Sequence, residues 1–214
     1  MARSAIPLYV TNQVITAAHS NTYWRDNEAA EWPFTAVGDK AYAAAGDTLS
    51  RQAIGTAGQI QRVNAAADAP VWGGIIYGSI YAAVDTTVGT AADTLVEMDT
   101  SYINIDGFVA TPVNDRITIP AGFDGYYLAN YYVEIDASAV GYRTVKLRKN
   151  AGLVDIDNTI IRMKAVDGGD TCISGVAIIH ADAADYITIC VYQNSGGNLD
   201  VENATLSLSL MLGD

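Results

Sequence analysis

The chain has 214 residues, half of them hydrophobic, so it is long enough for one domain with a sizeable core plus an extension. Only 17% of the residues are charged, and the formal net charge of −12 disfavours binding to nucleic acid or to an anionic membrane. We expect neither a signal peptide nor a membrane span, because the sequence holds no charged-apolar-small leader and no run of about 20 apolar residues.

The negative charge is concentrated in the C-terminal part. Residues 1–75 carry five basic and six acidic residues, whereas residues 76–214 carry seven basic and eighteen acidic ones. The nearly neutral N-terminal part is therefore the better candidate for a buried contact with a partner.

The N-terminus is predicted to form an extended arm and one short helix. In residues 1–15, Pro7 blocks a helix and the β-branched residues favour extension. Thr16 can cap a helix over residues 17–32, which Pro33 ends. The apolar face of this helix is thin, so we expect it to need a partner surface.

Residues 34–75 are rich in alanine and glycine and show no sustained period of either kind. Gly-Asp pairs at positions 38–39 and 46–47 divide the segment into short pieces. We therefore expect a stalk or clamp that is ordered by its neighbours. The predicted boundary is between an N-terminal part over residues 1–75 and a C-terminal domain over residues 76–214.

From residue 76 onwards, alternating segments rich in Ile, Val, Tyr and Thr are separated by Gly, Asp and Asn clusters. This pattern predicts an all-β fold, a ten-strand sandwich or jelly roll, because one face of each segment is apolar. The buried faces are expected at alternate positions from Tyr127 to Ile135, from Ile187 to Val191 and from Leu206 to Leu212. The predicted strands are residues 76–84, 94–98, 101–105, 116–119, 126–136, 143–149, 159–164, 171–180, 186–193 and 203–212.

The two cysteines, Cys172 and Cys190, are expected to be free. They lie in consecutive predicted strands that would form a hairpin centred near residue 182. In that register the two residues are offset by about three positions, which exceeds the roughly 5.5 Å Cα separation of a disulfide.

The polar residues predict no catalytic, cofactor or metal site. His19 and His180 lack a neighbouring nucleophile motif, and the histidines and cysteines do not have zinc-ligand spacing. Asp155 and Asp157 would share one face of an extended segment and could hold calcium or act as a glycosidase pair. The pairs Asp167/Asp170 and Asp182/Asp185 open the same alternatives, but all three pairs fit ordinary turn chemistry better.

Three tyrosines near predicted loops could stack on sugar rings. They are Tyr102, Tyr142 and Tyr192, and strand packing or a contact between subunits is the alternative for each.

The N-terminal part resembles segments of phage virion proteins. One resemblance covers a motif of the form (I/V)-T-A-A-x-x-N-T-x-x-R-D-N, and a second covers the linker of tail-fibre and head-decoration proteins. The first is carried by Ile15–Ala18, Asn21, Thr22, Arg25, Asp26 and Asn27. The second is carried by Gly38, Asp39, Tyr42, Ala43, Asp47–Leu49, Arg51 and Ala53–Gln59.

The C-terminal part resembles the jelly roll of complement globular heads and tumour necrosis factors. The family usually has glycine where Ala184 stands here. The resemblance implies a ten-strand sandwich that forms a compact trimer about a threefold axis. It is carried by the segments 116–120, 125–127, 145–150, 173–176, 181–187 and 205–212.

Together these resemblances imply a non-enzymatic structural protein of the virion, assembled in the host cytoplasm. We expect a homotrimeric head-decoration (cement or head-fibre) protein whose arm docks on the capsid and whose acidic knob faces outward. The alternative is a short tail or baseplate fibre whose knob binds a host-surface glycan or protein. The docking candidates are Ile15, Trp24, Arg25, Asp26, Trp32 and Arg51. The candidates for the trimer contact or the jelly-roll core are Tyr127, Tyr131, Ile187, Ile189, Leu206, Leu208 and Leu210.

Overall fold

The computed structural model describes residues 36–45, 48–64, 66, 68–73, 75–104, 109–111, 115–150 and 154–213. The predicted arm and helix of residues 1–32 lie outside these ranges. Contacts divide the chain into two units, Met1–Gly73 and Gly74–Asp214. The boundary predicted from the sequence, after residue 75, lies two residues further on.

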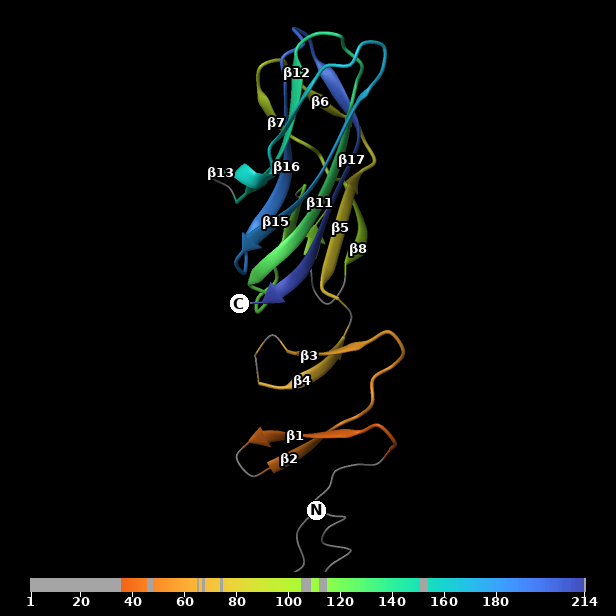
Figure 1. Cartoon of the computed structure of the whole chain (residues 1–214), viewed down its shortest axis with the longest axis vertical. Helices are drawn as coiled ribbons and strands as arrows, with labels where there is room; N and C mark the ends of the chain where they lie inside the picture. The colour runs from red at the N-terminus through yellow and green to blue at the C-terminus, as the bar shows by residue number, and fades with distance from the viewer. Residues whose placement is uncertain are drawn as a thin grey trace, which may run out of the picture. The chain divides into compact units, whose positions relative to one another are not determined.

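The first unit contains two antiparallel hairpins where the sequence predicted no regular element (Figure 1). Strand β1 (Lys40–Ala45) pairs with β2 (Thr48–Gln52), and β3 (Ile60–Val63) pairs with β4 (Pro70–Gly73). Polar side chains connect the hairpins: Gln61 accepts a hydrogen bond from Lys40 at 2.8 Å, and the Trp72 indole donates one to the carbonyl of Ala53 at 2.6 Å. Among the described residues of this unit only Gln52 and Gly73 are buried, so this described part contains no apolar core.

The second unit is a sandwich of two antiparallel sheets (Figure 1). One sheet has six strands in the order β15-β11-β17-β5-β8, with β6 also paired to β17. The other has seven strands in the order β13-β12-β16-β10-β9, with β14 paired to β12 and β7 paired to β16. The elements are β5 (Tyr77–Ala82), β6 (Thr86–Val88), β7 (Asp93–Leu95), β8 (Thr100–Asn104), β9 (Val109–Thr111), β10 (Arg116–Thr118), β11 (Gly125–Ile135), β12 (Tyr142–Lys149), β13 (Val154–Asp155), the 3-10 turn η3 (Asp157–Thr159), β14 (Ile161–Lys164), β15 (Thr171–Ala181), β16 (Tyr186–Gln193) and β17 (Leu199–Gly213).

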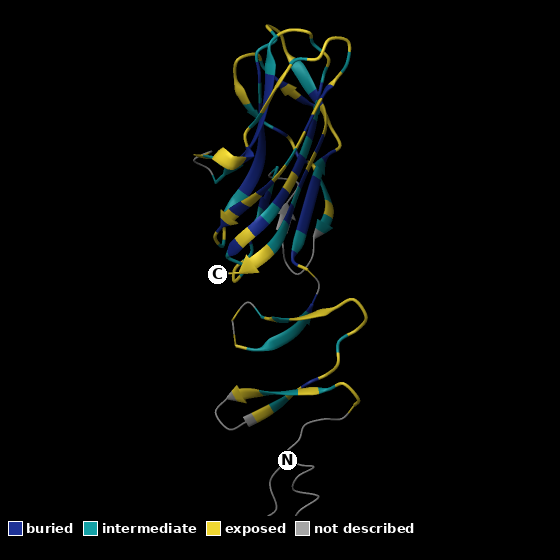
Figure 2. Ribbon diagram, in the orientation of Figure 1, coloured by how far each residue is buried: buried dark blue, intermediate teal, exposed yellow. Residues whose placement is uncertain are grey.

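The core lies between the two sheets and follows the predicted alternation (Figure 2). In β11 every second residue from Tyr127 to Ile135 is buried, and the intervening side chains are half-buried or exposed. This is the period-2 pattern of a strand with one buried face. The predicted buried face of the last strand ends early: Leu206 and Leu208 are buried, Leu210 is half-buried and Leu212 is 64% exposed. A register shift opposite Tyr126 and Tyr127 turns Leu212 out of the core.

The hairpin predicted between the two cysteine-bearing strands is wrong. Strand β15 belongs to the six-stranded sheet and β16 to the seven-stranded sheet, so the turn near residue 182 crosses between layers. Cys172 is exposed on one sheet and Cys190 is buried in the other, and both are free. The prediction of free thiols is therefore confirmed, but for a different reason from the register argument.

Candidate interaction surfaces

Basic residues occur on only one of the two sheets. All seven lysines and arginines of residues 76–214 lie in strands of the seven-stranded sheet: Arg116, Arg143, Lys146, Arg148, Lys149, Arg162 and Lys164. The strands of the six-stranded sheet contain no lysine or arginine. The two outward faces of the sandwich therefore differ in their chemistry.

The outward face of the six-stranded sheet has no lysine or arginine, and its carboxylates lie together at one end. The remainder, which we call the uncharged face, exposes apolar and hydroxyl-bearing side chains. In β15, Val176 is 66% and Ile178 is 53% exposed, and Leu212 of β17 lies next to Tyr126 of β11. The same three strands also carry Asn130, Ser174, Thr205, Ser207 and Ser209 on this face. A hollow of about 470 Å³ on this face is lined by Tyr77, Ser79, Tyr81, Tyr102, Thr205 and Ser207. Surfaces rich in tyrosine and poor in charge are typical of the centres of protein interfaces.

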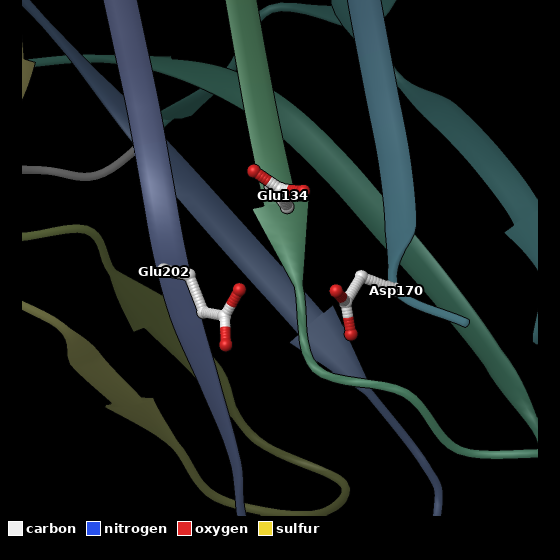
Figure 3. A group of neighbouring side chains, drawn as sticks. All are labelled: Glu134, Asp170 and Glu202. Atoms are coloured by element: carbon white, nitrogen blue, oxygen red, sulfur yellow. The ribbon is translucent and has the colours of Figure 1, made fainter. Parts of the chain in front are cut away.

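Three carboxylates gather at one end of this sheet (Figure 3). Glu134 at the end of β11, Asp170 before β15 and Glu202 in β17 have carboxylate oxygens within 4.8 Å of one another. The pKa of Glu202 is raised, mainly by Asp170 and further by partial burial, Asp136 and Glu134. Three such oxygens could ligate a cation, but acidic groups of this kind are common on protein surfaces, and a raised pKa at Glu202 is the effect expected of neighbouring carboxylates.

On the outward face of the seven-stranded sheet, four charged residues form an ion network. The Lys146 ammonium donates to Asp93 at 3.0 Å and to Asp155 at 2.8 Å. The Arg148 guanidinium bridges the same two carboxylates and lies 2.6 Å from Asp155. The Lys146 and Arg148 side chains are only 10% and 12% exposed, so the two carboxylates compensate charges that are nearly buried.

The pKa values of this network follow from two opposing effects. Burial raises the pKa of Asp155, but hydrogen bonds from Lys146 and Arg148 outweigh it and hold the pKa below its usual range. Burial likewise lowers the pKa of Lys146, and its bonds to Asp155 and Asp93 reverse that effect, so the pKa is raised. Asp155 and Lys146 are therefore both charged near neutral pH. Cys190 lies close to it with a pKa raised by burial to about 11.

Beside the network, two of the tyrosines predicted as sugar-stacking candidates lie against each other. Tyr142 of β12 and Tyr192 of β16 stack with ring centroids 5.6 Å apart and planes 22° apart. The Arg162 guanidinium lies 4.4 Å from the centre of the Tyr142 ring and donates to the Thr144 hydroxyl at 3.3 Å. These side chains line a hollow of about 360 Å³, which we call the tyrosine pocket. Its lining is Asp93, Tyr142, Thr144, Lys146, Asp155, Ile160, Arg162 and Tyr192.

The structure places the other predicted residues as follows. Tyr127, Tyr131, Ile187, Ile189, Leu206 and Leu208 are buried between the sheets and Leu210 packs against that core, so a contact between subunits would have to use other side chains. Arg51 forms an ion pair with Asp39 at 2.6 Å and so connects the ends of the β1-β2 hairpin. The remaining docking candidates, Ile15, Trp24, Arg25, Asp26 and Trp32, lie outside the described residues.

The polar residues considered for catalysis are distributed as follows. His180 lies on the uncharged face in edge contact with Tyr126, and its nearest carboxylate, Asp182, is 3.8 Å away. His19 lies outside the described residues. Asp155 and Asp157 do not share a face, because η3 begins at Asp157 and turns the chain. Asp185 accepts hydrogen bonds from Asn150 and from the Asp182 amide, which is turn chemistry. Among the described residues no helix is long and apolar enough to cross a membrane.

No family model and no curated protein matches the chain. Among solved structures, PRD1 vertex protein P5 has a TM-score of 0.51 at 13% identity, over 75% of this chain and 86% of P5. The globular domain of zebrafish complement 1qA protein has a TM-score of 0.47 at 12% identity, over 64% of this chain and 98% of that domain. The Eiger TNF of S. frugiperda has a TM-score of 0.45 at 11% identity, over 65% and 94%. The likeness to P5 shows the fold: the second unit is a jelly-roll sandwich, as predicted.

Proposed function

We propose that this chain is a non-enzymatic structural protein of a phage particle, a homotrimer with an N-terminal docking arm and a C-terminal jelly-roll knob. The uncharged face carries the proposal, because it is the surface on which three copies of the knob would meet. The finer assignment is a head-decoration protein, with a short tail or baseplate fibre as the second candidate.

Two features of the uncharged face support association with further copies of the same chain. Its apolar side chains, among them Val176, Ile178 and Leu212, gain favourable free energy when removed from water. Its lack of lysine and arginine means that the contact would bury no unpaired cation. The opposite sheet, with seven basic residues and an ion network, is the less suitable contact surface.

The hairpins of the first unit support the same assembly. Val37, Leu49, Ile54, Ile60 and Val63 are between 44% and 96% exposed, although they are among the most apolar residues of this unit. A single copy gives these side chains little burial, whereas three neighbouring copies could form a shared core. A fibre-like shaft made from three chains would satisfy this requirement.

Attachment to a particle is supported by the phage-like segments of residues 15–27 and 38–59 and by the name of the P5 neighbour, a vertex protein. In this proposal the nearly neutral residues 1–75 dock and the acidic knob projects into solvent. The tryptophans at positions 24 and 32 are suited to fill pockets of the docking partner.

The test is to measure the number of copies per purified particle by gel densitometry against the major shell protein. Hundreds of copies would support the head-decoration assignment, and a few to a few dozen would support the fibre. Absence of the protein from purified particles would contradict both assignments. As a variant, Trp24→Ala should lower the copy number while the knob stays folded, as judged by circular dichroism.

A further inference from the structure

The tyrosine pocket lies on the face that the proposed trimer leaves open, and all its lining residues come from one knob. Its volume of about 360 Å³ is at the lower end of small-ligand sites and corresponds to roughly one ring of a sugar chain. Strands β7, β12, β14 and β16 and the segment 155–160 position its walls, so the shape is fixed by paired backbone and not by a free loop.

The pocket wall combines aromatic and hydrogen-bonding groups. The stacked rings of Tyr142 and Tyr192 present apolar surface and hydroxyl groups together. Next to them the Thr144 hydroxyl, the Lys146 ammonium and the carboxylates of Asp93 and Asp155 supply both donors and acceptors. A saccharide needs this mixture, because its hydroxyl groups donate and accept while its C–H faces pack on aromatic rings.

The charge of the pocket indicates which saccharide it would bind. Lys146, Arg148, Asp93 and Asp155 neutralise one another. Arg162 adds one positive charge, is exposed, and forms no salt bridge with any carboxylate of the described part of the chain. A guanidinium held in place by an aromatic ring and a hydroxyl can pair with a carboxylate through two parallel hydrogen bonds.

The charge of the surrounding knob limits the ligand further. Residues 76–214 carry eighteen acidic and seven basic residues, so a nucleic acid or a densely sulfated chain would be repelled at short range. A single carboxylate on one ring matches the single local cation, whereas a chain with a charge on every ring would meet the same repulsion. We infer that the tyrosine pocket binds an acidic monosaccharide unit, a uronic or sialic acid within a surface polysaccharide, with its carboxylate on Arg162 and its ring against the tyrosine pair.

The test uses the full chain and a panel of uronic-acid and sialic-acid oligosaccharides, each paired with its carboxyl-reduced form. The wild-type protein should bind at least one acidic member and bind its reduced form at least ten-fold more weakly, because the reduced form cannot make charge-assisted hydrogen bonds to Arg162. Arg162→Gln should lose affinity for the acidic form to a similar extent. Tyr192→Ala should weaken both forms while the circular dichroism spectrum stays unchanged.

The matched control is Lys164→Gln, which removes the same charge from the same strand but does not line the pocket. Its affinity should stay within about two-fold of wild type, since exposed charges at a distance contribute little.

The inference would be overturned if wild type bound the acidic and reduced forms equally. It would also be overturned if Arg162→Gln and Lys164→Gln lost affinity for the acidic form to the same extent. Binding of an acidic peptide instead of any saccharide, dependent on Arg162, would reassign the pocket to a protein partner. If neither a saccharide nor a peptide binds, the tyrosine pocket is not a ligand site. None of these outcomes bears on the trimer, because one chain lines the pocket.

Discussion

Ala184 occupies the crossover between β15 and β16 with a φ of +68°, in the left-handed region that favours glycine. Glycine adopts this backbone region without strain, whereas the Cβ of alanine is crowded there. Ala184→Gly should therefore stabilise the knob by about 0.5–1 kcal/mol, as the relief of strain exceeds the added entropy of the unfolded chain. Thermal unfolding followed by circular dichroism would check this, and a lower melting temperature would contradict it.

The three neighbouring carboxylates of Glu134, Asp170 and Glu202, called the acidic trio below, predict that the contribution of Glu202 to stability depends on pH. Its pKa is raised, first by Asp170, so ionisation of Glu202 is less favourable in the folded than in the unfolded chain. The stability associated with the protonated form is present below the ordinary pKa of 4.5 and is lost as the pH rises through the folded value.

Glu202→Gln should thus raise the melting temperature at pH 7 and have little effect at pH 3. Glu97→Gln is a suitable control, as this exposed carboxylate lies outside the trio. An equal rise in melting temperature at both pH values, or a rise in Glu97→Gln, would show that repulsion within the trio does not destabilise the knob.

At the level of the elements, the ion network joins β7 to β12 and β13, and Asp93 of β7 lies 53 residues before Lys146. Asp155→Asn would leave the nearly buried Lys146 and Arg148 with one carboxylate between them. We expect a loss of about 2 kcal/mol at pH 7, below the range for a fully buried pair because Asp155 is 33% exposed.

The sign of the pH dependence is opposite to that of Glu202. The folded pKa of Asp155 is lowered, so its contribution is present above its ordinary pKa of 3.8 and is lost as the pH falls through the folded value. The difference in unfolding free energy between wild type and Asp155→Asn, measured with urea, should therefore be smaller at pH 3 than at pH 7. Asp157→Asn provides the control, because Asp157 is exposed and belongs to no ion pair of the described chain, and it should match wild type at both pH values.

The long strands could be predicted from sequence because alternation over eight to eleven residues, as in β11, β15 and β16, leaves one face apolar. Strands β6, β9 and β13 were missed because two or three residues cannot show a period. The hairpins of residues 40–73 were missed because their order depends on polar contacts such as Asp39 with Arg51, not on buried apolar faces.

The candidate sites were only partly predictable. Tyr142 and Tyr192 were selected as sugar-stacking candidates, but their contact depends on the pairing of β12 with β16, which sequence alone does not give. The ion network was not predicted, since Asp93 lies 53 residues before Lys146. The uncharged face was hidden because the absence of lysine and arginine becomes visible only when β5, β8, β11, β15 and β17 are seen as one sheet.

For the whole molecule, the proposed function depends on the restriction of lysine and arginine to one of the two sheets of the knob. It gives the knob one surface suited to burial against identical copies and one suited to solvent and ligands. Assembly through the uncharged face should depend weakly on salt, because apolar burial is not screened, whereas repulsion between acidic knobs is screened over about 8 Å at physiological ionic strength.

The most direct test of this account is the mass of the full chain in solution, measured by sedimentation at micromolar concentration. Wild type should have three times the 22.6 kDa mass of the chain. Val176→Lys, on the uncharged face, should dissociate the trimer while Val154→Lys, at a similarly exposed position on the other sheet, should leave it intact. A monomeric wild type, or a trimer that survives Val176→Lys, would contradict the account.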